Sequence, residues 1–337
     1  MAKKYDVIIV GASFAGLAVA SRIKSGKVLL ISPEKIGKNC KSACGTILYA
    51  VEDLNLEQTV LQVHKKIVLH TSRGALEYFL EKPFCVIDPQ KITQGLFKLG
   101  KAEKTEAQVL SFDGRVLKTN KGDFQARFFV DASGPQSVLS EDRPSFVSFG
   151  IETILPYQEK GLHFWYEPKI FPKGVFWLFP QGKTSRFGVA SYQGKTNLTP
   201  YLDEFLARFG LKVGKLHGGW FPHRLRQPVK GKVFRVGDAD GQCLPLTGEG
   251  IRPAIIFGQK CGEIIEDVLL KKMTLRQGFK QYQDFVLKRK HSYEILYWAQ
   301  QSLISVPEFL FWPFAWLVSK KRVMSFMLRN YLKIVPL

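Results

Sequence analysis

The first 23 residues constrain the fold more than any other stretch of the chain. Residues 7–10 are Val-Ile-Ile-Val, a continuous apolar run typical of a parallel strand that is buried on both faces. A glycine turn, GASFAG at residues 11–16, follows directly and leads into a helix-like segment that ends near Ile23. A strand, a glycine turn and a helix in this order predict a Rossmann-like α/β domain at the N-terminus.

The turn differs by one residue from the dinucleotide-binding pattern GxGxxG. Gly11 permits the tight turn, Ser13 occupies the position nearest a bound diphosphate, and Gly16 lets the helix pack on the strand. The partial positive charge of the helix N-terminus would stabilise that diphosphate. Gly11, Ser13, Ala15 and Gly16 are therefore predicted to bind a cofactor.

A second predicted strand, KVLLIS at residues 27–32, lies at the spacing expected for such a unit. The acidic residue that usually ends this strand and binds ribose hydroxyls is replaced by Ser32, and Glu34 follows two residues later. Ser32 and Glu34 are the candidates for the ribose contact. The alternative is a glycine turn in an α/β domain that binds no nucleotide.

Residues 236–254, VGDADGQCLPLTGEGIRPA, form a second glycine-rich segment far along the chain. An apolar strand ends at Gly237-Asp238, and Gly248-Glu249-Gly250 precedes a helix-like stretch that begins near Ile251. Glycines beside a helix N-terminus bring the backbone close to an anionic or flat group. This segment is therefore predicted to share a ligand with the first turn.

Together the two segments resemble those of flavin-dependent oxidoreductases of the p-hydroxybenzoate hydroxylase fold, and within them the geranylgeranyl reductase family. The resemblance extends from about residue 4 to about residue 300. It implies that Asp238 binds a ribitol hydroxyl of FAD and that Gly250 and Ile251 offer backbone groups to the isoalloxazine ring, with Gly248 in the same helix start. A helix N-terminus there would stabilise the negative charge of reduced flavin.

Further short segments extend the resemblance to the cofactor site. FFVDASGPQSVL, residues 128–139, resembles a mid-chain segment of the family with its Asp-Gly turn, here Asp131 and Gly134, followed by Ser137. AQVLSF matches a strand whose backbone meets the adenine, which implies a contact from Val109.

Two other positions concern the flavin and its phosphates. GKNCKSACGTI resembles a loop with Cys-Gly beside the flavin, so the resemblance implies contacts from Cys44 and Gly45. An arginine that often binds phosphate near residue 90 is absent, because Pro89 stands there.

Residues 146–227 contain short aromatic segments separated by turn residues, which is typical of antiparallel sheet. GVFWLFPQG resembles the YxWxFP motif of the reductases: Trp177, Phe179 and Pro180 match, and Val175 replaces the tyrosine. The resemblance implies that these three residues line a substrate cavity, and flat aromatic walls suit a long apolar chain. Flavin halogenases carry a similar motif, and an ordinary sheet core is the alternative interpretation.

The composition is that of a globular protein with an unusual charge. The chain has 337 residues, 45% of them hydrophobic, and a formal net charge of +20. Such an excess favours anionic partners. The sequence carries no helix-turn-helix, zinc-finger or RNA-binding signature, so no nucleic-acid partner is predicted. The charge favours an anionic membrane surface or a phosphorylated substrate, and a solvated lysine-rich surface is the alternative.

The remaining motifs exclude several classes of enzyme. No hydrolase or kinase motif occurs, and no second dinucleotide fingerprint is present, so electrons are predicted to come from an external donor such as NADPH or a ferredoxin. His163, His217 and His223 make no metal or triad spacing and are expected to be structural. The cysteines follow no zinc spacing, and their odd number without a signal peptide favours a reducing cytosol. They are Cys40, Cys44, Cys85, Cys243 and Cys261.

The last residues are predicted to be helical and basic. EFLFWPFAWLV at residues 308–318 is too short, and broken by proline, for a spanning helix, which needs about 20 apolar residues. The final helix is predicted to be amphipathic, so that it lies on an anionic membrane surface or caps the substrate cavity. Its basic side would carry Lys321, Arg322, Ser325, Arg329 and Lys333, and its apolar side Met324, Met327, Leu328 and Tyr331.

The sequence thus predicts a Rossmann-like FAD-binding domain, an inserted antiparallel β-sheet substrate domain and a C-terminal helical region. The FAD-binding domain comprises residues 1–75, 101–145 and 228–275, the substrate domain residues 76–100 and 146–227, and the helical region residues 276–337.

The predicted activity is an FAD-dependent reductase that saturates C=C bonds in isoprenoid (geranylgeranyl) chains of membrane lipids or their precursors. It would act in the cytoplasm or peripherally at the membrane, without a metal. The catalytic proton donor is not assigned; Cys44 or ordered water are the candidates. The alternative is an FAD-dependent monooxygenase or halogenase of an apolar or aromatic small molecule. A third possibility is a flavin-bearing, membrane-associated binding protein without catalysis.

Overall fold

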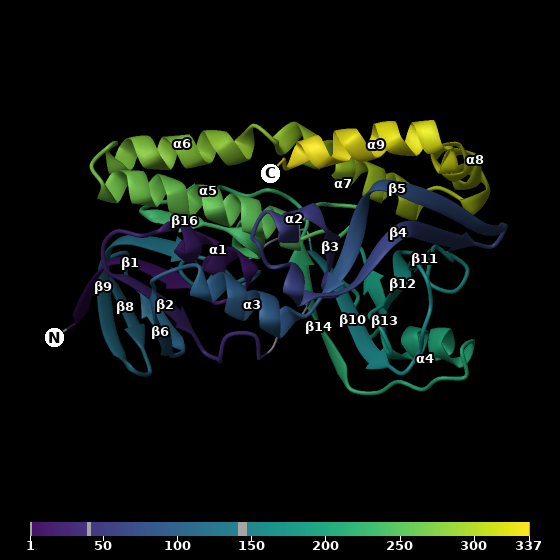
Figure 1. The fold of residues 1–337 in the computed structure, drawn as a ribbon, viewed down its shortest axis with the longest axis horizontal. Coiled ribbons are helices and arrows are strands. Elements are labelled where there is room, and N and C mark those ends of the chain that lie inside the picture. The colour runs from purple at the N-terminus through teal and green to yellow at the C-terminus, as the bar shows by residue number, and fades with distance from the viewer. Residues whose placement is uncertain (1, 39–41, 141–146, 337) are drawn as a thin grey trace. The chain divides into compact units, whose positions relative to one another are not determined.

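The computed structural model describes residues 2–38, 42–140 and 147–336; Cys40 lies outside the described residues. The chain divides into two compact units, each assembled from three separate segments (Figure 1). The first unit contains residues 1–40, 89–145 and 221–294, and the second contains residues 41–88, 146–220 and 295–337.

A sheet with a parallel centre forms the base of the first unit, in the order β15–β16–β9–β1–β2–β6. Ile8 and Ile9 are fully buried, as the apolar run predicted. Strands β7 and β8 extend the sheet as an antiparallel hairpin beside β9. The strands are β1 (Lys3–Val10), β2 (Val28–Ser32), β6 (Glu103–Glu106), β7 (Val109–Phe112), β8 (Val116–Thr119), β9 (Gly122–Asp131), β15 (Val229–Lys230) and β16 (Val233–Arg235).

Two helices of the first unit meet through glycines. A Cβ at Gly258 would lie 2.6 Å from the carbonyl oxygen of Ala15, and one at Gly262 would lie 2.4 Å from that of Val19. Helix α5 can therefore approach α1 only because these residues have no side chain. Helix α6 runs back alongside α5 (Figure 1). The helices are α1 (Phe14–Arg22), α3 (Pro89–Lys98), η2 (Gly237–Asp240), α5 (Ile251–Leu269) and α6 (Leu275–Leu287).

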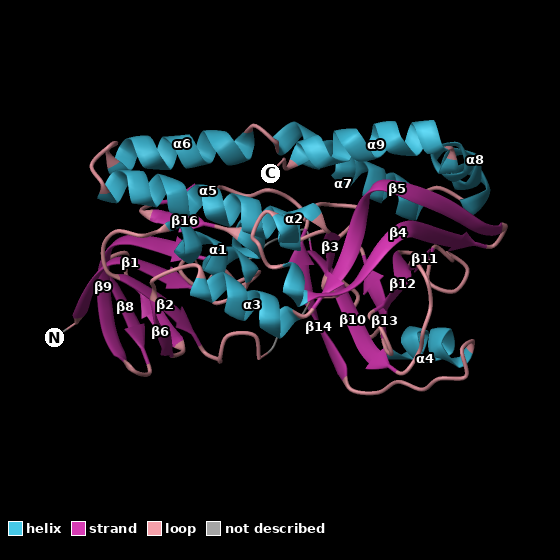
Figure 2. Cartoon of the chain, in the orientation of Figure 1, coloured by secondary structure: helices cyan, strands magenta, loops and turns pink. Residues whose placement is uncertain are grey.

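The second unit contains a sheet in the order β14–β10–β13–β12–β11–β4–β5–β3 (Figure 2). From β10 to β3 its neighbouring strands pair antiparallel, except β11 and β4, which are parallel. The elements before β14 are β3 (Gly45–Ile47), α2 (Tyr49–Glu52), η1 (Glu57–Thr59), β4 (Val60–Thr71), β5 (Gly74–Ile87), β10 (Val147–Leu155), β11 (Leu162–Trp165), β12 (Gly174–Pro180), β13 (Ser185–Ser191) and α4 (Thr199–Ala207), and β14 is Leu216–Pro222.

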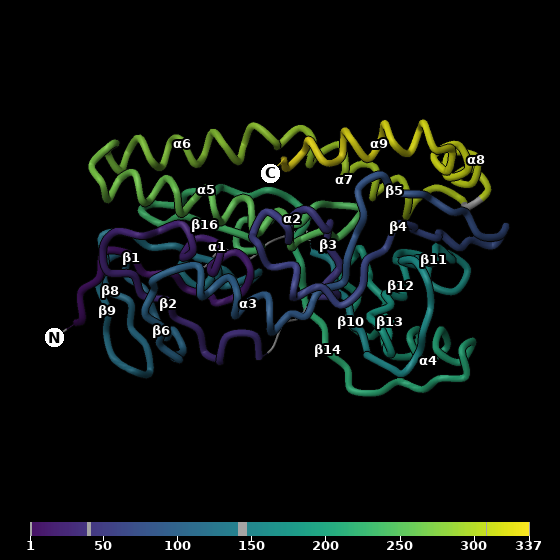
Figure 3. The backbone as a smooth tube through the Cα atoms, viewed as in Figure 1, coloured from purple at the N-terminus to yellow at the C-terminus, as the bar shows by residue number. Residues whose placement is uncertain are grey.

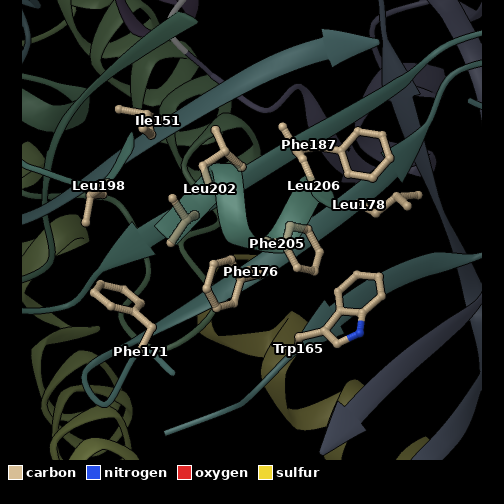
Figure 4. Close-up of a cluster of buried hydrophobic side chains, with 11 residues drawn as sticks. Ile151, Trp165, Phe171, Phe176, Leu178, Phe187, Leu198, Leu202, Phe205 and Leu206 are labelled. Carbon is tan, nitrogen blue, oxygen red and sulfur yellow. The ribbon is translucent and has the colours of Figure 1, made fainter. Parts of the chain in front are cut away.

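Helix α4 covers one face of this sheet, and the hydrophobic core of the unit lies between the helix and the sheet. Figure 4 shows Phe205 of α4 among Phe176, Phe187 and Trp165 of the strands, all of them buried. Because side chains alternate along a strand, every second residue of β10, β12 and β13 lies on the opposite face. That opposite face carries the polar and aromatic residues described below.

The α/β fold class with an inserted, largely antiparallel sheet is confirmed, but the segments divide differently from the sequence-based boundaries. Residues 41–75 belong to the second unit, because β4 forms one long hairpin with β5, which Figure 3 traces. Residues 89–100 belong to the first unit, since α3 packs on α1.

The C-terminal region is shared rather than separate. Helix α6 belongs to the first unit, whereas α8 (Glu308–Ser319) and α9 (Lys321–Ile334) pack on β5 in the second, and α7 is Lys290–Ser305. Two expectations are wrong. Pro313 lies inside an unbroken α8, and α9 buries Ser325 while exposing Met327, because contacts with β5 and α8 set its orientation. None of the helices that the structure describes is both long and apolar enough to span a bilayer.

Candidate functional site

The first glycine turn lies at the carboxyl ends of three parallel strands. The Gly11 amide donates to the carbonyl oxygen of Ile31 at 2.8 Å, and Gly11 has φ +112°. A Cβ at Gly11 would lie 2.1 Å from the carbonyl oxygen of Ala132. A Cβ at Gly16 would lie 1.9 Å from the carbonyl oxygen of Gly11. The turn therefore requires both glycines, as the sequence predicted.

The start of α1 beyond this turn is open. Ser13 occupies the N-cap position, is exposed, and makes no side-chain hydrogen bond to the helix. The first turn of α1 also carries no acidic residue. The amide groups at this helix end, and the partial positive charge that they carry, are therefore available to an anionic group such as a diphosphate.

The second glycine segment meets the first. Strand β16 pairs in parallel with β9, and the chain then turns at Gly237, which has φ +67°. A Cβ at Gly237 would lie 2.7 Å from the Cβ of Ala15. The predicted convergence of the two remote segments is therefore present within the first unit.

Asp238 follows this contact and is partly exposed. No described residue donates a hydrogen bond to its carboxylate, and burial raises its pKa to about 7. The carboxylate therefore still needs a hydrogen-bond donor, and a hydroxyl group of a bound ligand can supply one.

Gln242 fixes the turn that carries Asp238. Its side-chain oxygen accepts from the Gly237 amide at 2.7 Å, and its side-chain nitrogen donates to Asp240 at 3.0 Å and to Tyr282 at 3.2 Å. Tyr293 donates to the Gln242 carbonyl oxygen at 2.7 Å. Burial raises the pKa of Asp240 to about 8. This network, which the sequence analysis missed, holds the backbone at Gly237 rigidly.

The GEGI segment places two glycines with different roles. Gly248 has φ +65°, which favours glycine, whereas Gly250 has φ −108° and is the N-cap of α5. A Cβ at Gly250 would make only ordinary contacts, 3.6 Å from the Sγ of Cys243. The described residues alone therefore do not require glycine at position 250. Ile251 is buried at the first position of α5.

Glu249 and Arg252 lock this helix start. The Arg252 guanidinium donates to both carboxylate oxygens of Glu249 at 2.8 Å, and both side chains are buried. A buried, bidentate pair gives the loop one geometry. The sequence analysis did not single out this pair.

The remaining predicted residues of the first unit lie around the same sheet. Ser32 ends β2, and its Oγ accepts from the Glu34 amide at 3.4 Å. Val109 begins β7 and packs on the core cluster that contains Ile8. Asp131 is fully buried at the end of β9.

Asp131 organises the loop that follows β9. Its carboxylate accepts from the hydroxyl of Ser133 at 2.5 Å, the hydroxyl of Ser137 at 3.0 Å and the amide of Leu139 at 3.0 Å. Gly134 and Ser137 have φ +83° and +47°. These residues therefore shape the loop at the strand end.

The second unit contains Cys44, Gly45 and the aromatic motif. Cys44 is fully buried with φ +59°, and its Sγ donates to the carbonyl oxygen of Ser42 at 3.1 Å. A Cβ at Gly45 would lie 3.0 Å from the ring of Phe179. The Cys-Gly pair and the motif aromatic, which are distant in sequence, therefore lie together. Pro180 is buried, and its carbonyl oxygen is 3.0 Å from Nε2 of His64.

Trp177 lies across the sheet face opposite α4. A Cβ at Gly188 would come within 2.1 Å of its indole ring, and one at Gly150 would lie 3.5 Å away. The indole Nε1 donates to Oε2 of Glu152 at 3.2 Å. Two glycines and one hydrogen bond thus fix the orientation of the ring, which is half-buried.

Glu152 on β10 contacts side chains on three further strands: Trp177 on β12, Arg186 on β13 and His217 on β14. Its Oε1 lies 2.6 Å from Nη1 of Arg186 and 2.6 Å from Nε2 of His217. The Glu152 and Arg186 side chains are only 4% and 5% exposed, and that of His217 is 28% exposed. A glutamate inside the apolar segment FGIETIL could have indicated a buried charged group. Its partners could not be identified from the sequence, because they lie on other strands.

The other predicted structural histidines are accounted for. Nδ1 of His163 lies 2.9 Å from Nε2 of His70, whose pKa burial lowers to about 4. His223 is buried, which lowers its pKa to about 4. Across residues 2–38, 42–140 and 147–336, no group of three or more His, Cys, Asp or Glu residues is placed to hold a metal ion.

Known proteins resemble this chain in sequence and in fold. It is 30% identical to the digeranylgeranylglycerophospholipid reductase of Methanococcus aeolicus, over 83% of this chain and 81% of the relative. The chain belongs to the geranylgeranyl reductase family of FAD-dependent oxidoreductases. A second member, the digeranylgeranylglycerophospholipid reductase of Methanocaldococcus jannaschii, is 25% identical over 87% of this chain and 84% of its own.

Solved structures agree with the family fold. A geranylgeranyl bacteriochlorophyll reductase-like protein of Thermoplasma acidophilum superposes with a TM-score of 0.84 at 18% identity, covering 95% of this chain and 92% of that chain. A probable FAD-dependent monooxygenase of Pseudomonas aeruginosa gives 0.70 at 16% identity, over 90% and 97%. At these identities both likenesses concern the fold alone. No family model matches the chain.

The first unit fits the FAD of this reductase family. The two glycine turns meet beside the open N-terminus of α1 and together form what we call the cradle. A side chain at Gly11 or Gly237 would clash with Ala132 or Ala15, respectively, and push the turns apart. Gly250 leaves space that no described residue occupies closely, and Asp238 has a partly exposed carboxylate without a donor. These features suit a diphosphate, a flat ring and a polyol chain, respectively.

Proposed function

We propose that this reductase saturates C=C bonds in the isoprenoid chains of membrane lipids or of their precursors. The observation that carries the proposal is the similarity, across most of the chain, to a reductase whose name specifies a digeranylgeranyl glycerophospholipid. The cradle of the first unit and the aromatic sheet face of the second support it.

The FAD would be held by the residues that the sequence analysis assigned. Gly11, Ser13, Ala15 and Gly16 would hold the diphosphate, Asp238 the ribityl chain, and Gly248, Gly250 and Ile251 the ring. Ser32 and Glu34 would take the ribose, and Val109 the adenine. Cys44 and Gly45 remain proposed flavin contacts. Once reduced by an external donor, the bound flavin would supply the hydride, and the protein would supply binding, orientation and the exclusion of water.

The aromatic face would orient the substrate chain. Phe179 packs edge-on against Phe164, with ring centroids 5.3 Å apart, and the Trp177 indole is held by its hydrogen bond to Glu152. Such rings bury an isoprenoid chain without requiring polar partners from it. Saturation also consumes a proton; ordered water or the thiol of Cys44, which now donates to the Ser42 carbonyl oxygen, is the proposed source.

The electron donor and the site of action are part of the same proposal. The sequence holds one dinucleotide fingerprint, so we propose an external donor, either NADPH or an electron-transfer protein such as a ferredoxin. A lipid substrate places the reaction at a membrane surface, and we propose that the protein works there peripherally.

The activity can be tested by mass spectrometry. The purified protein is reconstituted with FAD, reduced with dithionite and incubated with an unsaturated digeranylgeranyl glycerophospholipid. Products heavier by two hydrogens per reduced bond are expected, and an unchanged lipid with dithionite, NADPH and reduced ferredoxin would contradict the proposal. In parallel, the reduced protein is mixed with oxygen in a stopped-flow instrument. A long-lived hydroperoxide spectrum would favour the monooxygenase or halogenase alternative.

Gly250 offers a separate test of the flavin position. Because a Cβ there meets only ordinary contacts, Gly250→Val should fold like the wild type. The β-branched side chain should nevertheless occupy the space proposed for the flavin ring. The purified variant is expected to be colourless with an unchanged circular dichroism spectrum. A yellow variant with full flavin occupancy would show that the ring lies elsewhere.

A further inference from the structure

Exposed large apolar side chains gather on the C-terminal helices of the second unit. Helix α8 alone exposes Phe309, Leu310, Phe314, Trp316 and Leu317, each between 48% and 57%. Helix α9 adds Phe326 at 66% and Met327 at 38%. Single exposed apolar residues need no explanation, but a contiguous set on one helix does.

Helix α8 is apolar on two sides, and only one of them is needed for the fold. Its inner side packs Ala315 and Val318 against Leu76 and Tyr78 of β5. The hydroxyl of Tyr78 donates to the Ala315 carbonyl oxygen at 3.0 Å. The helix is thus anchored to the sheet by its inner side, so its outward apolar residues are not explained by the core.

The charges beside this surface have one sign. Lys320, Lys321, Arg322, Arg329 and Lys333 are exposed, and no acidic residue occurs after Glu308 in the sequence. None of these five forms an ion pair with a described residue. The Nζ of Lys320 lies 3.8 Å from the ring centroid of Trp316. A lysine that stacks on an exposed tryptophan joins the basic and apolar parts at one point.

We propose that the outward side of α8, with the basic residues 320–333 beside it, is a docking surface for an anionic lipid membrane. Phe314, Trp316 and Leu317 enter the boundary between headgroups and acyl chains, while the lysine and arginine side chains bind the phosphates. Charge complementarity favours lipid over a second copy of this chain, because two such basic surfaces would repel each other. The proposal rests on the peripheral membrane contact put forward above and assigns that contact to residues other than those proposed to hold the flavin, so it can be tested without turnover.

Vesicle co-sedimentation tests this surface without any turnover. The holoenzyme is mixed, without a reductant, with vesicles of saturated phosphatidylglycerol or saturated phosphatidylcholine. The wild type should bind phosphatidylglycerol vesicles and lose most of that binding at high salt. The double variant Phe314→Ser/Leu317→Ser should bind these vesicles at least about tenfold more weakly, because it lacks two apolar side chains that would be buried in the membrane. Lys321→Gln/Arg322→Gln should reduce binding to phosphatidylglycerol specifically.

A matched control and a depth measurement complete the experiment. Leu110 on β7 of the first unit is 64% exposed, so Leu110→Ser removes a comparable side chain and should leave binding unchanged. Brominated lipids should quench the emission of the wild type more than that of Trp316→Phe. Vesicle binding that the α8 variants leave unchanged would overturn the proposal. So would a wild-type dimer that binds no vesicles and that the double variant converts to a monomer.

Discussion

The backbone of Gly237 lies against the methyl group of Ala15, so that a Cβ on Gly237 would sit 2.7 Å from the Cβ of Ala15. The two residues are far apart in sequence, one in the first turn of α1 and the other at the start of η2. Their contact joins the two glycine segments in the first unit. A side chain at position 237 would push these two segments apart.

Gly237→Ala is therefore expected to destabilise the first unit and lower its FAD occupancy. The left-handed backbone costs a non-glycine residue roughly 1–2 kcal/mol, and the contact with Ala15 adds about 1–3 kcal/mol of overpacking. Urea unfolding and flavin absorbance measure the two effects. Gly231→Ala is the control, since Gly231 also has φ +59° but no atom lies within 4 Å of its added Cβ. Equal losses in both variants would contradict the role of the Ala15 contact.

Asp238 predicts a loss of stability as pH rises in the flavin-free protein. Its pKa is raised from 3.8 to about 7, so the folded state holds a proton that the unfolded state releases between these values. Stability should be full below about pH 4, fall between about pH 4 and pH 7, and stay reduced above. Asp238→Asn should remove this part of the pH dependence, on the order of 1 kcal/mol because the side chain is only partly buried.

Thermal unfolding of the flavin-free proteins at a series of pH values measures this difference. Asp113→Asn serves as the control with the opposite sign, because the amides of Val116 and Arg115 lower the pKa of the Asp113 carboxylate. If the stability of the wild type and that of Asp238→Asn change with pH in parallel, the pKa of Asp238 is not raised in the folded protein.

The parts of the site that the sequence predicted are those encoded locally. The GASFAG turn carries its own geometry in Gly11 and Gly16, and the second segment carries its own in Gly237 and Gly248. Short-range requirements of this kind can be derived from residue types alone. The existence of a β-rich aromatic region was predictable for the same reason.

What the sequence did not predict depends on contacts between remote strands. Glu152, Arg186 and His217 stand on three strands, and nothing in their spacing indicates that one carboxylate serves both cations. The membership of residues 41–75 in the second unit follows from the β4–β5 hairpin. The orientation of α9 follows likewise from its packing on β5 and α8, so its projected faces were wrong at Ser325 and Met327.

Gly188→Ala is expected to displace the indole of Trp177. The added methyl group would come within 2.1 Å of the ring, which must move and lose its hydrogen bond to Glu152. Overpacking of this kind costs about 1–3 kcal/mol. The indole N–H resonance, assigned with Trp177→Phe, should shift, and kcat/KM for an isoprenoid lipid should fall. Gly182→Ala, in the turn between β12 and β13 with no atom near its added Cβ, should leave that resonance in place. An unmoved resonance in Gly188→Ala would contradict the close packing.

Glu152→Gln tests the buried charge on the same sheet face. The substitution keeps the shape of the side chain but leaves Arg186 without its carboxylate, and breaking a buried pair costs about 3–5 kcal/mol. Glu167→Gln is the matched control, because Glu167 pairs with Arg208 at 2.7 Å where the side chains are 18% and 35% exposed, and such pairs contribute about 0–1 kcal/mol. Urea unfolding should separate the two variants clearly. Since His217 and Trp177 share the Glu152 carboxylate, the buried variant should also shift the indole resonance of Trp177, whereas the control should not. A Glu152→Gln protein as stable as Glu167→Gln would mean that the network does not hold the aromatic face in place.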